Sequence, residues 1–182
     1  MRPLRILIDG VTYHVTSEIN RGNYDLQEPR FKQAFLDFVK KTKKKFSFEL
    51  WNFCVLDNHI HFLMKPGPGE SLSKIMQYLK SRFARWWNKM HNITGSLWGQ
   101  RFFSRIIKDE KDFARVSEYI DENPVKAGLA KKPEQWRFGG LFHRLRRILD
   151  LIDLIPDPTT LFTPNPKIEL RNIRQTSRYP KI

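Results

Sequence analysis

Two histidines one residue apart, His59 and His61, are the residues of this chain whose types and spacing best suit chemistry. Side chains alternate between the two faces of a β-strand, so both imidazoles should project from the same face. The opposite face would be filled by Ile60, Phe62 and Met64, which predicts that it packs into the core. Neutral imidazole is a common metal ligand, so the pair could hold one divalent ion. The alternative for any lone His-x-His is an ordinary hydrogen-bonded residue of the surface or core.

A tyrosine on a predicted helix is the candidate nucleophile. Tyr119 and Asn123 are four residues apart and share a helix face, which is rotated from the apolar residues Phe113, Val116 and Ile120. A phenol with a pKa of about 10 is mostly protonated at neutral pH, but a nearby metal favours the phenolate, which can attack a phosphodiester. The Asn123 amide oxygen could complete the protein ligands. The alternative is an amphipathic tyrosine at the edge of a helix.

The charge of the chain favours phosphate-rich partners. Its 33 Lys and Arg against 19 Asp and Glu give a formal net charge of +14, which attracts nucleic acid or acidic membrane surfaces. We expect no signal peptide, and no run approaches the roughly 20 apolar residues that cross a bilayer. The single cysteine, Cys54, excludes an internal disulfide and fits a buried thiol in a reducing compartment. We therefore expect a cytoplasmic, nucleoid-associated protein with no membrane partner.

The elements that must position these residues alternate between strands and helices. The patterning predicts strands over residues 11–20, 46–56 and 59–65 and within 98–108, and helices over 29–45, 71–92 and 109–123. Ser71 and Asp109 are predicted helix caps. This order predicts an α+β fold, an antiparallel sheet with helices packed on it.

Two boundaries rest on local backbone chemistry. Asp57 and Asn58 tolerate left-handed backbone and predict a two-residue hairpin turn between the second and third strands. Pro124 disfavours helical geometry at Asn123, which predicts that the last helix of the sheet domain ends there.

Several sequence blocks resemble the single-tyrosine HUH transposases of the IS200-like superfamily, most closely the REP-associated tyrosine transposases. The two signature blocks are residues 56–63 (LDNHIHFL) and 119–129 (YIDENPVKAGL). Further similar blocks are 13–16 (YHVT), 21–23 (RGN), 79–83 (LKSRF) and 97–103 (LWGQRFF). Together they cover roughly residues 11–140, and blocks in this order are more specific than any one motif. They imply a catalytic domain over residues 1–140, which we expect to be followed by a C-terminal helix over 141–155 and an extended or disordered basic tail over 156–182.

The resemblance implies a ferredoxin-like core and cleavage of single-stranded DNA beside a folded hairpin of the REP type. His59 and His61 would hold Mg²⁺ or Mn²⁺, and Asn123 stands where related enzymes carry a third ligand, often glutamine. Tyr119 would attack the phosphorus and leave a 5′-phosphotyrosine bond and a free 3′-hydroxyl, so that a second strand's 3′-hydroxyl could rejoin it without ATP. Relatives include obligate dimers as well as monomers; we expect no obligate protein partner, and the long basic tail favours a monomer.

Cations spread along the chain are the candidate DNA contacts, because each one that neutralises a phosphate strengthens binding. They are Arg21, Lys43, Lys44, Arg82, Arg85, Arg101, Arg105, Lys126, Arg171 and Arg174. The lysines of residues 40–45 could equally be a solvated helix end. Trp86 and Trp87 could stack unpaired bases, although their helical spacing favours core positions. The remaining histidines, His14 among them, are expected to be structural.

Two other function classes stay open on these residues. One is a catalytically inactive hairpin-binding module of the same fold, and the other is a metal-dependent hydrolase that uses water and forms no covalent intermediate. A covalent adduct between protein and DNA separates the transferase from both.

Overall fold

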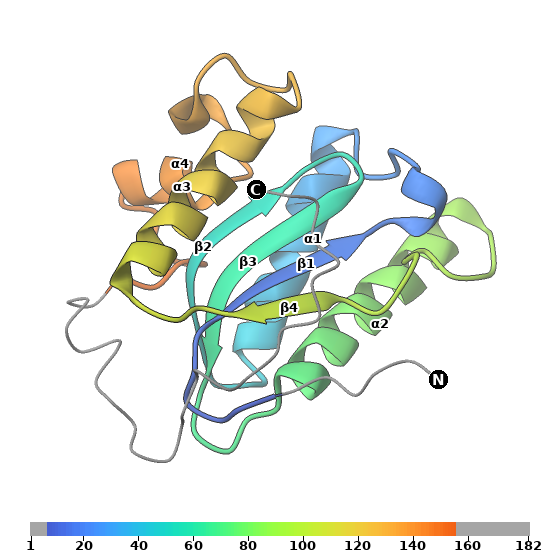
Figure 1. The fold of residues 1–182 in the computed structure, drawn as a ribbon. Helices are drawn as coiled ribbons and strands as arrows, with labels where there is room; N and C mark the ends of the chain where they lie inside the picture. Colours follow the sequence, from blue (N-terminus) through green and yellow to red (C-terminus); the bar gives the residue numbers. More distant parts are fainter. Residues whose placement is uncertain (1–6, 156–182) are drawn as a thin grey trace.

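The computed structural model describes residues 7–155. They form a four-stranded antiparallel sheet in the order β2-β3-β1-β4 (Figure 1). The elements are, in chain order, β1 Tyr13–Glu18, the short 3-10 helix η1 Asn20–Gly22, α1 Pro29–Lys43, β2 Phe48–Val55, β3 His59–Pro66, α2 Leu72–His91, β4 Phe103–Ile106, α3 Glu110–Lys126, the 3-10 helix η2 Pro133–Gln135 and α4 Gly140–Leu145. The predicted α+β fold is therefore confirmed.

Helices cover both faces of the sheet, which separates two apolar layers. Ile60, Phe62 and Met64 of β3 pack in the larger core with α1 and α2, as the strand pattern predicted. On the other face, Val116 and Ile120 of α3 belong to a smaller cluster beneath that helix. Its strand residues are Trp51, Cys54 and Leu63, and Leu56, just after β2, also belongs to it. In Figure 1, α3 lies on the opposite side of β2 and β3 from α1.

The predicted helix caps form as expected. The Ser71 hydroxyl accepts from the Lys74 amide at 3.4 Å at the start of α2, and Asp109 accepts from the Asp112 amide at 2.8 Å at the start of α3. Asn92 ends α2 in the left-handed conformation, with φ 50°. These caps mark both ends of α2 and the start of α3.

Residues 56–58 lie between β2 and β3, and the Leu56 amide donates to the His59 carbonyl at 2.9 Å, so that Asp57 and Asn58 form the predicted turn. Neither of them has the left-handed backbone that the sequence suggested. Tertiary contacts hold the turn instead. The Leu26 amide donates to the Asp57 carbonyl at 2.9 Å, and the buried Lys32 ammonium lies 2.7 Å from the Asp57 carboxylate. The turn therefore has contacts with Leu26 and with Lys32 of α1.

Pro124 does not end α3, so the predicted boundary at Asn123 is wrong. The helix continues to Lys126, and the amides of Ala127 and Leu129 donate to the carbonyls of Asn123 and Pro124 at 2.9 and 2.8 Å. A proline inside a helix removes one backbone hydrogen bond. The proline is buried, and the hydrogen bonds of the following turn continue past it.

The helix expected over residues 141–155 is wrong beyond its first turns. The helix α4 ends at Leu145, and Arg147 adopts a left-handed φ of 54°. The chain then runs along the edge of β2, where Asp153 and Leu50 exchange hydrogen bonds at 2.8 and 2.7 Å. Lys43 also lies 2.5 Å from the Asp153 carboxylate. An amphipathic pattern alone does not reveal these edge contacts.

Within residues 7–155, no helix is both long and apolar enough to cross a membrane. The predicted basic tail over 156–182, with Arg171 and Arg174, lies outside the described residues. The division of the chain into a catalytic domain and appendages stays a prediction.

Candidate active site

Three histidines meet on the face of the sheet that α3 partly covers. The rings of His59 and His61 lie with centroids 5.0 Å apart on β3. In the register of β1 and β3, Glu18 stands opposite His59 and Thr16 opposite His61. His14 lies two residues before Thr16 and is therefore diagonal to His61, and its Nε2 lies 3.0 Å from His61 Nδ1.

Helix α3 brings Tyr119 to these histidines. The Tyr119 ring centroid lies 5.7 Å from that of His61 and 6.0 Å from that of His14, with edge-on geometry in both pairs. The Lys126 ammonium lies 5.1 Å from the same tyrosine ring. A histidine pair, a phenol and a cation thus come together within one chain.

Asn123 lies one turn after the tyrosine and contacts it. Its Nδ2 donates to the Tyr119 carbonyl at 2.6 Å, which leaves Oδ1 as the acceptor end of the amide. Burial raises the pKa of the Tyr119 phenol, and a hydrogen bond with the Asn123 side chain opposes part of that rise. The free phenol is therefore protonated at neutral pH, and ionisation requires added positive charge.

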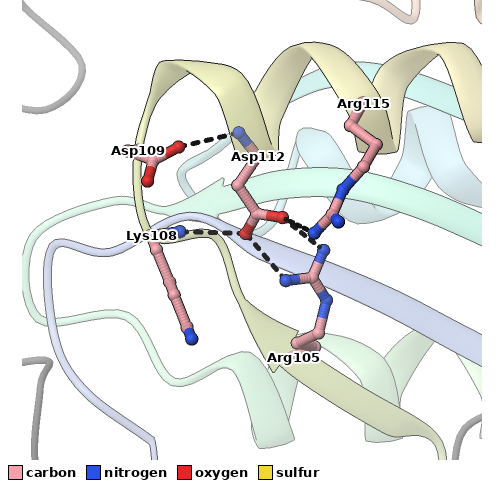
Figure 2. Close-up of polar contacts among 5 residues, drawn as sticks. All are labelled: Arg105, Lys108, Asp109, Asp112 and Arg115. Carbon is pink, nitrogen blue, oxygen red and sulfur yellow. Dashed lines mark hydrogen bonds and ion pairs between the residues drawn. The ribbon is translucent and has the colours of Figure 1, made fainter.

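A cluster of charged residues fixes the start of α3 (Figure 2). Both terminal guanidinium nitrogens of Arg105, on β4, donate to Asp112 at 2.7 and 3.0 Å. Arg115 and the Lys108 amide also donate to this carboxylate, at 2.7 and 3.1 Å. Burial alone would raise the pKa of Asp112, but the hydrogen bonds from Arg105, Arg115 and Lys108 outweigh it and lower that pKa.

A second polar network holds the middle of α3 on the sheet. The amide nitrogen of Asn52, buried on β2, donates to the Ser117 hydroxyl and the Asp121 carboxylate, each at 2.9 Å. The guanidinium of Arg144 donates to Asp121 at 3.0 Å. Ser117 and Asp121 flank Tyr119 in the sequence, so these contacts and the Asp112 cluster determine where the tyrosine lies.

The histidine nitrogens fit a divalent cation. Asn58 Oδ1 lies 2.6 Å from His59 Nδ1, and an amide oxygen only accepts, so Nδ1 carries the proton and Nε2 the lone pair. The Nε2 of His61 is buried without a hydrogen-bond partner. Burial lowers the pKa of both histidines and keeps them in the neutral form that binds metal.

Carboxylates and thiols of the described residues form no cluster of metal ligands with these histidines. Among residues 7–155, no group of three or more His, Cys, Asp or Glu could hold a metal ion. The protein ligands would be the two histidines and the Asn123 amide oxygen. Mg²⁺ and Mn²⁺ prefer oxygen ligands, so water and substrate phosphate would supply the rest of the coordination beside the two imidazoles.

The predicted DNA-contacting cations within the described residues differ in exposure and in ion pairing. Exposed ones are Arg21, Lys44, Arg82, Arg85, Arg101 and Lys126. Lys43 is paired with Asp153, and Arg105 with Asp112, so the charges of both are used within the protein. Trp87 is buried and Trp86 is half-buried, which favours core positions over stacking on unpaired bases.

Sequence reasoning missed two neighbours of the histidine pair. It treated His14 as structural and gave Glu18 no role, although strand alternation already places His14 and Thr16 on one face of β1. The sequence does not give the register between β1 and β3, because no local pattern encodes it. Arg115, one turn before Tyr119, was also overlooked.

Comparison with known proteins matches this architecture. The family model of IS200-like transposases matches residues 8–123. The REP-associated tyrosine transposase of Escherichia coli strain K12 is 28% identical over 156 residues, which cover 85% of this chain and 91% of that protein. A Haemophilus influenzae protein assigned provisionally as a REP-associated tyrosine transposase is 32% identical over 120 residues, 60% of this chain and 68% of that protein.

A solved structure agrees with these relatives. The REP-associated tyrosine transposase bound to a REP hairpin matches with a TM-score of 0.70 and 27% identity, over 87% of this chain and 93% of that chain. The chain belongs to the IS200-like transposase family, in its branch of REP-associated tyrosine transposases.

Proposed function

We propose that this protein is a metal-dependent endonuclease and strand transferase that cuts single-stranded DNA next to REP-like hairpins. The observation that carries the proposal is the position of Tyr119, whose ring lies 5.7 Å from that of His61, itself beside His59. Similarity to a transposase solved with a REP hairpin supports the substrate class.

Tyr119 is the proposed nucleophile. Its phenolate oxygen forms a bond to the phosphorus, the bond from phosphorus to the 3′-oxygen breaks, and that oxygen leaves and takes up a proton. The products are a 5′-phosphotyrosine and a free 3′-hydroxyl. Because one phosphate ester replaces another, a second 3′-hydroxyl can reverse the step on a new strand.

The neighbouring residues lower the barrier to this step in different ways. His59, His61 and the Asn123 amide oxygen would hold Mg²⁺ or Mn²⁺, which favours the phenolate and stabilises charge on the phosphate and the leaving oxygen. Lys126 lies against the tyrosine ring and adds a second positive charge. Asn123 also contacts the phenol and keeps it oriented.

The DNA would follow exposed cations toward this site. The Lys126 ammonium lies 5.1 Å from the Tyr119 ring. Further exposed charges for phosphates are Arg21, Lys44, Arg82, Arg85 and Arg101. With DNA as substrate, the proposed place of action is the nucleoid.

One chain supplies both the histidine pair and the tyrosine. Asn52 and Asp112 fasten α3 to its own sheet on either side of Tyr119. This arrangement supports action as a monomer without an obligate protein partner.

A cleavage assay tests the proposal. The protein, with Mn²⁺ or Mg²⁺, is incubated with 3′-labelled single-stranded hairpins flanked by unpaired DNA and analysed on a denaturing gel. We expect a slowly migrating covalent product that is lost with chelator and in Tyr119→Phe. Tight hairpin binding without any product would instead support the inactive binding module. Cleavage that survives in Tyr119→Phe would support a hydrolase that uses water.

A further inference from the structure

The contact between His14 and His61 joins two buried imidazoles. His14 is 0% exposed and His61 4%, and their rings stack with centroids 5.2 Å apart and planes 24° apart. His14 Nε2 lies 3.0 Å from His61 Nδ1, which is hydrogen-bonding distance. One of these two nitrogens must therefore donate a proton and the other must accept it.

The direction of this hydrogen bond decides what the other nitrogen of His61 can do. A neutral imidazole carries one N–H and one lone pair. If His61 Nδ1–H donates to His14, then the lone pair of His61 lies on Nε2. If His14 donates instead, Nε2 carries a hydrogen and cannot bind a cation.

We propose that His14 is a positioning residue that accepts from His61 Nδ1–H and fixes the His61 lone pair on Nε2. The inference deepens the proposed function, since that lone pair is the one offered to the metal. His61 Nε2 is buried without a hydrogen-bond partner, which is costly for an N–H donor and acceptable for a lone pair that a cation uses.

The other histidine of the pair has the same arrangement. His59 Nδ1 lies 2.6 Å from Asn58 Oδ1, so His59 also donates through Nδ1 and keeps its lone pair on Nε2. In this arrangement His14 accepts from Nδ1–H of His61, and Asn58 accepts from Nδ1–H of His59. Partners of this kind fix the tautomer and ring orientation of metal-binding histidines.

His14 does not itself serve as a third ligand. Its Nε2 is engaged with His61 Nδ1, and within the described part of the chain no set of three His, Cys, Asp or Glu side chains could surround one ion. The role assigned to His14 is therefore to orient His61.

Binding of Mn²⁺ to three variants tests the role of the acceptor. His14→Gln keeps an acceptor near the position of Nε2, His14→Phe keeps a ring without one, and His91→Gln is a control at the exposed end of α2. We expect the Phe variant to bind Mn²⁺ about 10–100-fold more weakly by titration calorimetry, as for other lost partners of metal-binding histidines. The Gln variant and the control should bind like the wild type. Equal binding by the Phe variant, or equal loss in the Gln and Phe variants at unchanged melting temperature, overturns the proposal.

A measurement without metal keeps the inference separate from the proposed function and from any folding defect. Nitrogen-15 NMR of the metal-free wild-type protein reports which ring nitrogen of each histidine carries the proton. We expect His61 in the Nδ1–H form. A His61 protonated on Nε2, with His14 as the donor, overturns the inference whether or not the protein cuts DNA. If the wild type fails to bind Mn²⁺ but shows the Nδ1–H form, the assignment of His14 stands and the proposed metal dependence fails.

Discussion

The ring of Tyr119 lies edge-on to that of His61, with centroids 5.7 Å apart and planes at 88°. The two residues come from α3 and β3, which do not follow each other in the sequence. Their approach depends on the contacts that fasten α3 to the sheet. The tyrosine thus reaches the histidines of its own chain.

Removing either histidine should separate binding from cleavage. In His59→Ala or His61→Ala we expect the cleavage rate to fall on the order of 100-fold or more, since a catalytic metal contributes several kcal/mol. Hairpin affinity in a gel-shift assay should stay near that of the wild type, because the proposed phosphate-binding cations are unchanged. An equal loss of binding and cleavage would mean that the histidines are structural.

Loss of the Asp112 carboxylate should lower the free energy of unfolding far more than loss of its exposed partner Arg115. Asp112→Ala removes the carboxylate that holds Arg105, whose side chain is only 12% exposed, and should lower the free energy of unfolding by about 3 kcal/mol. Arg115→Ala removes a partner that is 65% exposed and should cost less than about 1 kcal/mol. Urea unfolding of both variants measures the difference. Equal losses would contradict the structural role of the cluster.

The same carboxylate should give the fold a distinct acid dependence. Its hydrogen bonds with Arg105, Arg115 and Lys108 lower the pKa of Asp112 despite burial, so the unfolded chain binds its proton more readily than the fold does. The stabilisation is present above the ordinary pKa of 3.8 and is lost as the pH falls through the lower folded value. Urea unfolding from pH 6 to pH 2 should show this loss in the wild type. Asp112→Asn should lack that component, and an identical acid profile in both proteins would rule it out.

Lys126 should affect the chemistry more than the fold. Its ammonium lies 5.1 Å from the Tyr119 ring, where it would stabilise developing phenolate charge. In Lys126→Gln we expect the single-turnover cleavage rate to fall about 5-fold, as for loss of about 1 kcal/mol at an exposed cation–π contact. The melting temperature should not change. Lys131→Gln, which replaces another exposed lysine just after α3, is the matched control. Equal rates in the two variants would remove Lys126 from the mechanism.

The sequence predicts the parts of this molecule that local physics controls. Strand alternation predicted that His59 and His61 share a face and that Ile60 and Phe62 enter the core. The helical period predicted that Ile120 lies on the buried face of α3. These patterns depend only on where each side chain points along its own element. They can therefore be predicted without knowledge of the tertiary structure.

What the sequence could not supply are contacts between distant elements. The pairing of His14 with His61 requires the register of β1 against β3, and the extended course of the chain near Asp153 follows from its bonds to Leu50. The continuation of α3 past Pro124 depends on burial of that ring and on the next turn. In the last two cases a tertiary contact outweighs a local preference.

The most direct test of the central claim identifies the amino acid that becomes attached to DNA. The covalent product formed with a hairpin substrate and Mn²⁺ is digested with nuclease and trypsin, and the modified peptide is sequenced by mass spectrometry. We expect a 5′-nucleotide on the Tyr119 hydroxyl and on no other tyrosine. Attachment at a different residue, such as Tyr78, or cleavage products without any modified peptide would contradict it.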